Sequence, residues 1–399
     1  MRKRIAIVII SALGLTIISF LFLSGVIPQS RIAKLKRFFN KGTLEWITET
    51  RVENLKTPFY SKRHELEILT PVFHIDTIYH SMAGISRGYP TQLDNEGNPH
   101  LIWFTDYSVD VTDKSGDKPM SMDFMCHNNL DFTISEYLEH FNMSDRLGTI
   151  NQRFLTLTGG QTSIKFPEGF GIPLFSDNNI TVHAQILNHN IYPVSVDVRH
   201  RIKLGYVREQ DLTTPLKPLY KQVLFIRVPV TEDSHLPGDP CIQECAPVPA
   251  SVASIKKAND GKSYTPHWVI KTGRDTFRFN VTEMLHLTTN TTMHFANVHL
   301  HPYAESLALR DITTDSVVFT SYVKNSAGKT GMDNIDIYSS EKGTMLFKDH
   351  QYELVCLTNN NSGIKQDMMA VMIVYMRDLE LENNIEQMRK KGLLTGNEN

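Results

Sequence analysis

The 399-residue chain is long enough for two domains with sizeable hydrophobic cores. Its formal net charge is only -2, so bulk electrostatics give no reason to expect nucleic-acid binding. With 21% charged and 41% hydrophobic residues, the composition is typical of a globular protein and excludes a largely disordered chain.

The chain begins with a basic cluster followed by an uncharged apolar run. Arg2, Lys3 and Arg4 precede residues 5–27, which contain no charged side chain. About 20 apolar residues span a bilayer as a helix, and no small-x-small cleavage pattern follows the run. We therefore expect a retained transmembrane signal anchor over residues 1–28, with a long cleaved signal peptide as the alternative. Either way, the body is expected to be extracytoplasmic (periplasmic, lumenal or extracellular).

The pattern of apolar and polar residues changes after a polar segment. Residues 29–69 are polar and basic, and we interpret them as a stalk with a short helix around residues 44–55. Beyond residue 70, short apolar or alternating runs recur between Gly, Pro, Asn and Asp, which is typical of an all-β sandwich or barrel. Strands do not alternate with helices, so a doubly wound fold is not expected. The predicted strands cover residues 101–111, 180–187, 222–230, 276–281, 293–301, 316–323 and 368–376.

A stretch rich in proline and cysteine, residues 231–254, interrupts this pattern in the way that inter-domain linkers do. Cys241 and Cys245 lie within it, and a short-loop disulfide between them fits an oxidising compartment. A two-thiol metal site is the alternative, but zinc would need two further ligands nearby, and none are obvious.

The predicted fold class is all-β, with two tandem antiparallel β-sandwich (jelly-roll) domains after an N-terminal transmembrane helix. The first sandwich is expected over residues 70–230 and the second, catalytic one over residues 255–380. The polar tail, residues 381–399, is interpreted as either helical or disordered.

The clearest chemical motif is the His-Leu-His at His299 and His301, in a strand-like run. Side chains two residues apart on a strand project from the same face, so both imidazoles can reach one metal ion. A bare His-x-His is common, however, and two polar residues on a solvated face are the alternative interpretation.

A second run, residues 368–376, is β-type and contains four Met residues. Methionine often fills irregular cores. If instead one thioether completes a site with two imidazoles, the ligand set favours copper, and cuprous copper in particular, over zinc or magnesium.

Several landmarks follow one another in the C-terminal third. They are the segment 268–273, Met293-His294 ahead of the His-x-His pair, and the segment 352–357, which leads through an Asn/Gly loop into Asp367-Met368. In this order, residues 267–377 resemble the catalytic domain of the copper type II, ascorbate-dependent monooxygenases, the family of peptidylglycine α-hydroxylating monooxygenase and dopamine β-monooxygenase. Lys271 and Thr272 replace two prolines of the family pattern.

The resemblance implies a copper-dependent monooxygenase that inserts one oxygen atom of dioxygen into a substrate C–H bond. It places the catalytic copper on His299, His301 and Met368, with Met369 as the fallback, and it implies ascorbate or a similar reductant as the electron donor. The substrate would be a small molecule or a peptide. Neither its identity nor the oligomeric state follows from the sequence.

The same family has a second copper, held by three His in the N-terminal domain. Cys126-His127 stands where the family has adjacent His residues, and His183 and His189 flank the strand position of a further family His. We expect this second site to be weak or absent, held by His127 and His189, with Cys126 and His183 as the candidates for a further ligand. A buried, hydrogen-bonded role is the alternative for His127.

Two other hypotheses stay open. One is a non-enzymatic copper-binding or ligand-binding envelope protein on the same double-sandwich fold. The other is a structural or carbohydrate-binding module, because fold does not fix function. His200 and His267 are interpreted as structural.

Overall fold

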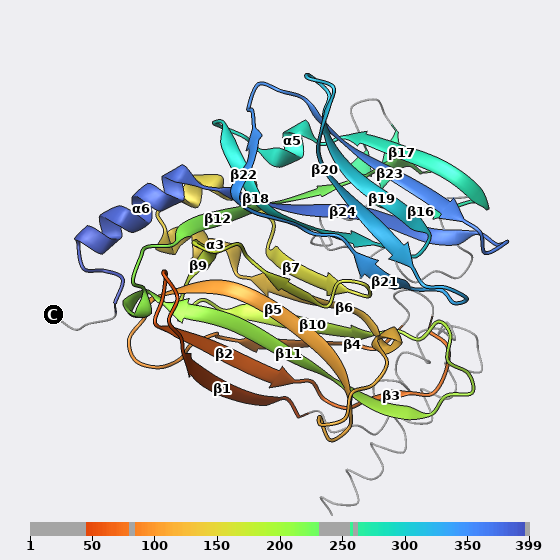
Figure 1. The fold of residues 1–399 in the computed structure, drawn as a ribbon, viewed down its shortest axis with the longest axis horizontal. Helices are drawn as coiled ribbons and strands as arrows, with labels where there is room; N and C mark the ends of the chain where they lie inside the picture. Colours follow the sequence, from red (N-terminus) through yellow and green to blue (C-terminus); the bar gives the residue numbers. More distant parts are fainter. Residues whose placement is uncertain (1–44, 80–83, 231–255, 258–261, 396–399) are drawn as a thin grey trace, which may run out of the picture. The chain divides into compact units, whose positions relative to one another are not determined.

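The computed structural model describes residues 45–79, 84–230, 256–257 and 262–395, and this part of the chain is mostly β-strand with a few short helices (Figure 1). Each strand run predicted from the sequence overlaps a strand of the structure. Among the described strands, pairing is antiparallel except for a two-residue parallel contact between β9 and β12.

Two facing sheets, here called the first sandwich, form the N-terminal half. One sheet contains β1 (Ile47–Asn54), β2 (Lys62–Leu69), β11 (Val196–Arg208), β5 (Leu101–Asp113) and β9 (Phe170–Phe175) in this order, with β3 (Phe73–Ile75) on β11 and β8 (Ser163–Lys165) on β5. The other contains β4 (Ser86–Thr91), β10 (Ile180–Ile186), β6 (Met125–Phe132) and β7 (Arg153–Thr158).

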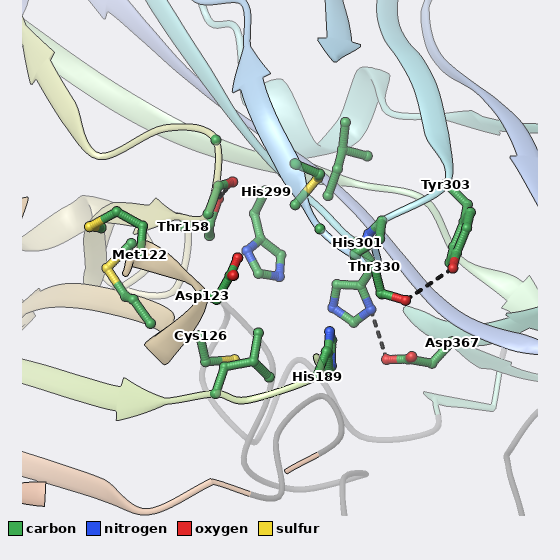
Figure 2. A pocket seen from close by; sticks show the side chains of 18 of the residues that line it. Met122, Asp123, Cys126, Thr158, His189, His299, His301, Tyr303, Thr330 and Asp367 are labelled. Carbon is green, nitrogen blue, oxygen red and sulfur yellow. Dashed lines mark hydrogen bonds and ion pairs between the residues drawn. The ribbon is translucent and has the colours of Figure 1, made fainter. Parts of the chain in front are cut away.

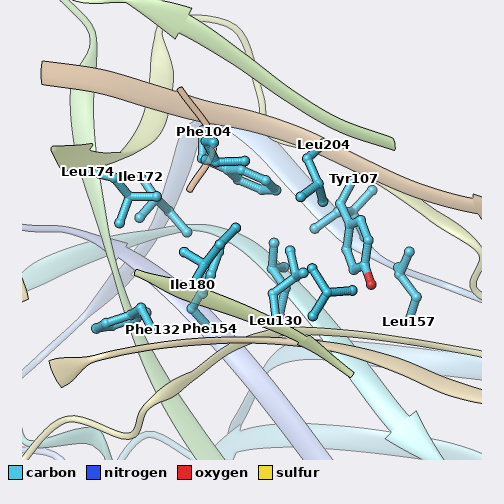
Figure 3. Packing of buried hydrophobic residues seen from close by; sticks show 14 of the residues in the cluster. Phe104, Tyr107, Leu130, Phe132, Phe154, Leu157, Ile172, Leu174, Ile180 and Leu204 are labelled. Atoms are coloured by element: carbon cyan, nitrogen blue, oxygen red, sulfur yellow. The ribbon is translucent and has the colours of Figure 1, made fainter. Parts of the chain in front are cut away.

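The core of the first sandwich lies between these two sheets. Phe104 and Leu204 of the larger sheet pack against Leu130 and Ile180 of the smaller one (Figure 3). Because side chains alternate along a strand, the inward position of Leu130 places His127 on the opposite face of β6. That outer face is covered by the second half of the molecule.

The second sandwich contains two further sheets. One consists of β12 (Lys217–Phe225), β24 (Gln366–Arg377), β18 (Thr291–Leu300) and β22 (Tyr338–Leu346), with β16 (His267–Ile270) on β24. The other consists of β17 (Gly273–Asn280), β23 (Tyr352–Asn360), β19 (Ala304–Asp311), β20 (Ser316–Asn325) and β21 (Met332–Ile335). Smaller elements are β13 (Val228–Pro229), β14 (Lys256–Lys257), β15 (Ser263–Thr265), α3 (Ile134–His140), α5 (Thr282–Leu285), α6 (Leu379–Lys390) and the 3-10 turns η1 (Met122–Phe124), η2 (Ser144–Arg146) and η3 (Glu209–Asp211).

Strand β24 is buried on both faces, which explains its nearly continuous apolar sequence. Met368 and Met372 belong to the core of the second sandwich, whereas Val371 and Tyr375 join the core cluster of the first. The Tyr375 hydroxyl donates a 2.7 Å hydrogen bond to the carbonyl of Phe154 on β7. The sheet that carries β24 therefore packs directly on the β4–β10–β6–β7 sheet.

The strand order differs from the predicted boundary between the two tandem sandwiches at residues 231–254. Strand β12, which the sequence places in the N-terminal domain, pairs with β24 from Leu219 to Phe225. The same strand also meets β9 of the first sandwich over two residues, and one 12-stranded sheet thereby runs through both halves. The alternation of apolar and polar residues predicts that a segment is a strand, but not which strand it pairs with. The pairing partners of β12 therefore could not be predicted from the sequence.

Two flanking segments also differ from expectation. Part of the predicted stalk forms strands β1 and β2, which pair over their full lengths, and the helix expected around residues 44–55 is strand β1. Every residue of β1 is exposed, so this edge strand lacks the apolar alternation that identifies strands. At the other end, the polar tail forms α6, whose Leu381 and Ile385 are buried in the first core.

The predicted N-terminal transmembrane helix is not supported. No helix in the described part of the chain is long and apolar enough to cross a membrane. The prediction rested on hydropathy along residues 5–27 alone, and residues 1–28 lie outside the described residues, as do the linker 231–254 and its proposed Cys241–Cys245 disulfide.

Candidate metal centre

The structure places the two predicted histidine ligands side by side. His299 on β18 pairs with Val371 on β24, and His301 follows just beyond the end of β18. Their ring centroids are 5.5 Å apart and their planes are inclined at 82°. Each is only 5% exposed. Because Val371 faces the first sandwich, its directly opposed partner His299 does so too.

Met368, the predicted third ligand, does not join this pair, and the assignment is corrected. Met368 is fully buried in the core of the second sandwich, on the opposite face of β24 from Val371. A one-residue shift in register moves every side chain of a strand to the other face. Met369, the alternative ligand, lies opposite His267 and on the same face as Val371.

A carboxylate and another imidazole extend the pair. Asp367 Oδ2 lies 2.8 Å from His301 Nδ1, out of line for a hydrogen bond (Figure 2). It also lies 3.3 Å from His267 Nε2. Two ligand atoms that each bind one ion at about 2.1 Å lie roughly 3.0–3.4 Å apart. The donor atoms of all three residues lie within 4.8 Å of one another, as a shared ion would require.

The charge on Asp367 is favoured by these neighbours. Burial by itself raises the pKa of this carboxyl, but His301 and His267 outweigh burial and hold it well below its usual value. Neither His267 nor Asp367 was named as a ligand from the sequence. The pairing of β16 with β24 brings them together across 100 residues, and no local pattern predicts that pairing.

His299 is chemically unusual because both of its ring nitrogens are buried without a hydrogen-bond partner. Burial, followed by the neighbouring His301, His127 and Arg153, lowers its pKa well below the usual value, so the imidazole is neutral. Leaving a buried polar atom unpaired costs about 1–3 kcal/mol, and each such case in a native protein calls for an explanation such as a bound ion. A neutral imidazole with a free lone pair is the form that binds metals.

Residues of the first sandwich that were predicted as metal ligands also lie near His299 and His301. His127 on β6 lies 6.4 Å from His299 between ring centroids, and its Nδ1 is buried without a partner. Burial is the main cause that lowers its pKa to about 3. Cys126 and His189 line a cavity together with His299 and His301 (Figure 2). The candidates for two separate copper sites thus converge on one region between the sandwiches.

His183 behaves differently from these residues. Its side chain is 38% exposed, and Nε2 lies 3.6 Å from Asp131 Oδ2. It does not line the cavity with His189 and Cys126. His183 therefore differs from the buried, unpaired imidazole of His299.

The cavity is small, at about 90 Å³, and both sandwiches contribute to its walls. It adjoins two larger grooves of about 770 Å³ and 570 Å³. Lys329, in the loop between β20 and β21, donates 2.7 Å hydrogen bonds to both carboxylate oxygens of Asp123. The next residue, Thr330, donates its amide to Asn190 at 3.1 Å and meets the Tyr303 hydroxyl at 3.1 Å. This loop therefore ties the two halves together beside the cavity.

The donor set suits a transition metal. Imidazole nitrogens bind copper, zinc, iron and nickel, whereas magnesium and calcium prefer oxygen ligands. Two imidazoles on one ion place their ring centroids roughly 4.5–6.5 Å apart, given metal–nitrogen bonds of about 2.1 Å. The spacings of 5.5 Å for His299–His301 and 5.4 Å for His267–His301 fall in this range. Without Met368, however, the set does not by itself select copper.

Comparisons with known proteins leave the family of this chain open. No protein-family model matches it, and no curated protein does. The crystal structure of the STIV MCP is similar over 79% of this chain and 98% of its own, at 9% identity and a TM-score of 0.27. A crystal structure of peptide-N(4)-(N-acetyl-β-D-glucosaminyl) asparagine amidase is similar over 77% and 96%, at 8% identity and a TM-score of 0.30. Neither fold nor function is inferred from similarities this low.

Proposed function

We propose that this chain is a copper-dependent monooxygenase whose metal centre includes His299 and His301. The observation that carries the proposal is the burial of both ring nitrogens of His299 without partners, beside a second imidazole and an open cavity. The choice of copper, and of C–H hydroxylation with ascorbate or a similar reductant, comes from the sequence resemblance over residues 267–377. When bound, copper would supply the activation of dioxygen.

The residues of the chain would prepare the ligands. Asp367 Oδ2 lies 2.8 Å from His301 Nδ1 without a hydrogen bond, so this carboxylate would bind the ion beside His301 and offset its positive charge. Burial keeps His299 neutral, so no proton has to leave before the ion binds.

The surroundings would position the substrate. The groove of about 770 Å³ has the size of a small-molecule site. It meets the inner cavity at Pro302, Tyr303, Thr330, Gly331 and Gln366, which line both. A small molecule or a peptide in this groove could present one C–H bond to the cavity while the rest stays outside. The class of substrate is not assigned.

A second candidate function is metal binding without oxygen chemistry. The orientation of Met368 favours it, because the side chain that would have selected cuprous copper points into the core of the second sandwich. A site of imidazoles and one carboxylate also binds zinc or iron. Turnover separates the two candidate functions, because only a monooxygenase consumes dioxygen.

The decisive experiment is an anaerobic copper(I) titration of the full-length chain against a competing chelator. We expect about one tightly bound equivalent in the wild type and its loss in His299→Gln and His301→Gln. The control is His74→Gln, because His74 contacts Asp197 and does not line the cavity. Oxygen consumption with ascorbate, measured with peptides and phenylethylamines, then tests turnover. Bound copper without turnover would favour the second candidate, and a wild type that binds no copper would contradict the proposal.

A further inference from the structure

Buried histidine nitrogens without partners occur at several places in the described part of the chain, but only some of them lie together. His64 and His200 each have one such nitrogen, and their other ring nitrogens have partners, Asp211 at 3.1 Å and Asn128 at 3.0 Å respectively. His127 also has a buried nitrogen without a partner, and it lies beside His299, for which both nitrogens are unpaired.

The geometry between the sandwiches fits a shared ion. The rings of His127 and His299 are 6.4 Å apart at 86°, and those of His299 and His301 are 5.5 Å apart at 82°. With metal–nitrogen bonds of about 2.1 Å, two imidazoles on one ion have ring centroids roughly 4.5 Å apart when the bonds are perpendicular and roughly 6.5 Å apart when they are collinear. His127 and His299 would therefore bind the ion from nearly opposite sides. His127 comes from β6 and the other two from β18, so one ion would have ligands from both halves.

The two strands are held in place by contacts that do not involve the histidine side chains. His127 pairs with Thr158 on β7. On the same strand, the carbonyl of Thr156 accepts a 3.1 Å hydrogen bond from the side chain of Asn297 on β18, two residues before His299. Strand β7 thus fixes β6 relative to β18. A site whose ligands are held by rigid elements needs little rearrangement to bind an ion.

The carboxylate that could have paired with His127 already has another partner. Asp131 lies on the same face of β6, but its carboxylate is paired with the guanidinium of Arg153. Arg153 and the neighbouring imidazoles also disfavour a positive charge on His127. The ring is therefore buried, uncharged and next to that of His299, which is the state of a metal ligand rather than of an ion-paired core histidine.

We propose that His127 supplies a ligand from the first sandwich to the ion held by His299 and His301, so that a single metal centre joins the two halves of the molecule. This inference rests on the proposed metal centre and not on the hydroxylation. It replaces the expected second copper site, because its main candidate ligand belongs to the first centre. Metal binding should then stabilise both halves together.

The test compares His127→Gln with the wild type and with His183→Gln. His183 serves as the control because it projects from the neighbouring strand, is partly exposed and lies beside the carboxylate of Asp131. Copper(I) affinity, the number of coordinated imidazoles from X-ray absorption, and the copper-induced rise in unfolding temperature are measured on the full-length chain. We expect His127→Gln to lower affinity by about tenfold or more, a change of roughly 1.4 kcal/mol, to remove one imidazole and to reduce the thermal shift. His183→Gln should match the wild type.

Other results separate this inference from the proposed function. If His299→Gln abolishes binding while His127→Gln changes nothing, the interdomain ligand is refuted and the metal centre stands. Two equivalents in the wild type, of which His127→Gln removes only one, would likewise refute it in favour of a separate site. No copper in the wild type would remove the metal centre itself. His127→Asn provides a second variant, and if neither variant folds, fewer than three coordinated imidazoles in the wild type would overturn the inference.

Discussion

At the scale of single residues, the environment of each side chain decides its chemistry more than its type does. His200 and His299 are both buried histidines, yet His200 accepts a hydrogen bond from Asn128 in the first core, whereas His299 has no partner at either nitrogen. Adjacent methionines differ as strongly, because Met368 and Met369 face different cores. Substitutions of these histidines and methionines should therefore differ in their effects on metal affinity and stability.

The two methionines give the first prediction. Met368→Leu should leave copper(I) affinity unchanged and cost less than about 1.5 kcal/mol of stability, because leucine has a similar volume in the second core. Met369→Leu is the matched comparison, since Met369 lies on the face of β24 that carries the histidine cluster. Chelator competition and denaturant unfolding measure both quantities. A large loss of affinity in Met368→Leu would show that the register of β24 is wrong.

His200 gives a prediction about pH. Burial lowers the pKa of His200 to about 4, below the usual value of 6.5. Between pH 6.5 and 4 the unfolded chain binds a proton that the folded chain does not, so stability should fall as the pH is lowered through this window, by at most about 3.4 kcal/mol. Below the folded pKa, this contribution no longer changes.

The measurement is denaturant unfolding at a series of pH values in the absence of metal. His200→Gln lacks the titrating group and should lose less stability than the wild type as the pH falls from 6.5 to 4. The difference between the two profiles isolates His200 from other buried histidines. Parallel profiles for the two proteins would contradict the assignment.

At the scale of elements, exposure explains which segments were predicted correctly. Strands with one or two buried faces, such as β5 and β24, have the apolar patterns that the sequence analysis recognised. Edge strand β1 is exposed throughout and was interpreted as part of a stalk. Helix α6 has few apolar positions, but Asp378 caps its N-terminus by accepting hydrogen bonds from the amides of Glu380 and Leu381.

Helix α6 should contribute to stability despite its polar sequence. Leu381 is fully buried in the first core, so Leu381→Ala should cost about 2–5 kcal/mol through lost burial and a residual cavity. Leu379→Ala is the control from the same helix, because Leu379 is 49% exposed and its loss should cost about 0.5 kcal/mol or less. Equal effects in chemical unfolding would mean that the helix does not dock as described.

At the scale of the whole molecule, the two sandwiches are joined by a sheet and by a packed interface. Strand β12 pairs with β9 of the first sandwich over two residues, and Tyr375 of β24 donates a hydrogen bond to Phe154 of β7. Lys329 and Asp123 form an ion pair between the halves beside the histidine cavity. These contacts differ from the small, polar interfaces that usually separate domains in one chain.

The shared core predicts cooperative unfolding. Metal-free protein should unfold in a single transition, with near-UV and far-UV circular dichroism following the same curve, because neither half keeps its buried surface without the other. Tyr375→Phe removes one bond between the halves and should shift that transition by about 1 kcal/mol without splitting it. Two separate transitions would indicate that the sandwiches are independent domains.

The sequence by itself determined the strand-rich class, the positions of the better-buried strands and the same-face spacing of His299 and His301, because these depend on the two-residue period of a β-strand. It could not determine which strands pair. The pairing of β16 with β24 brings His267 to Asp367, and the packing of β6 near β18 brings His127 to His299. Such contacts join residues far apart in the chain, and a one-residue register shift is enough to exchange Met368 for Met369. Only the tertiary structure decided these features.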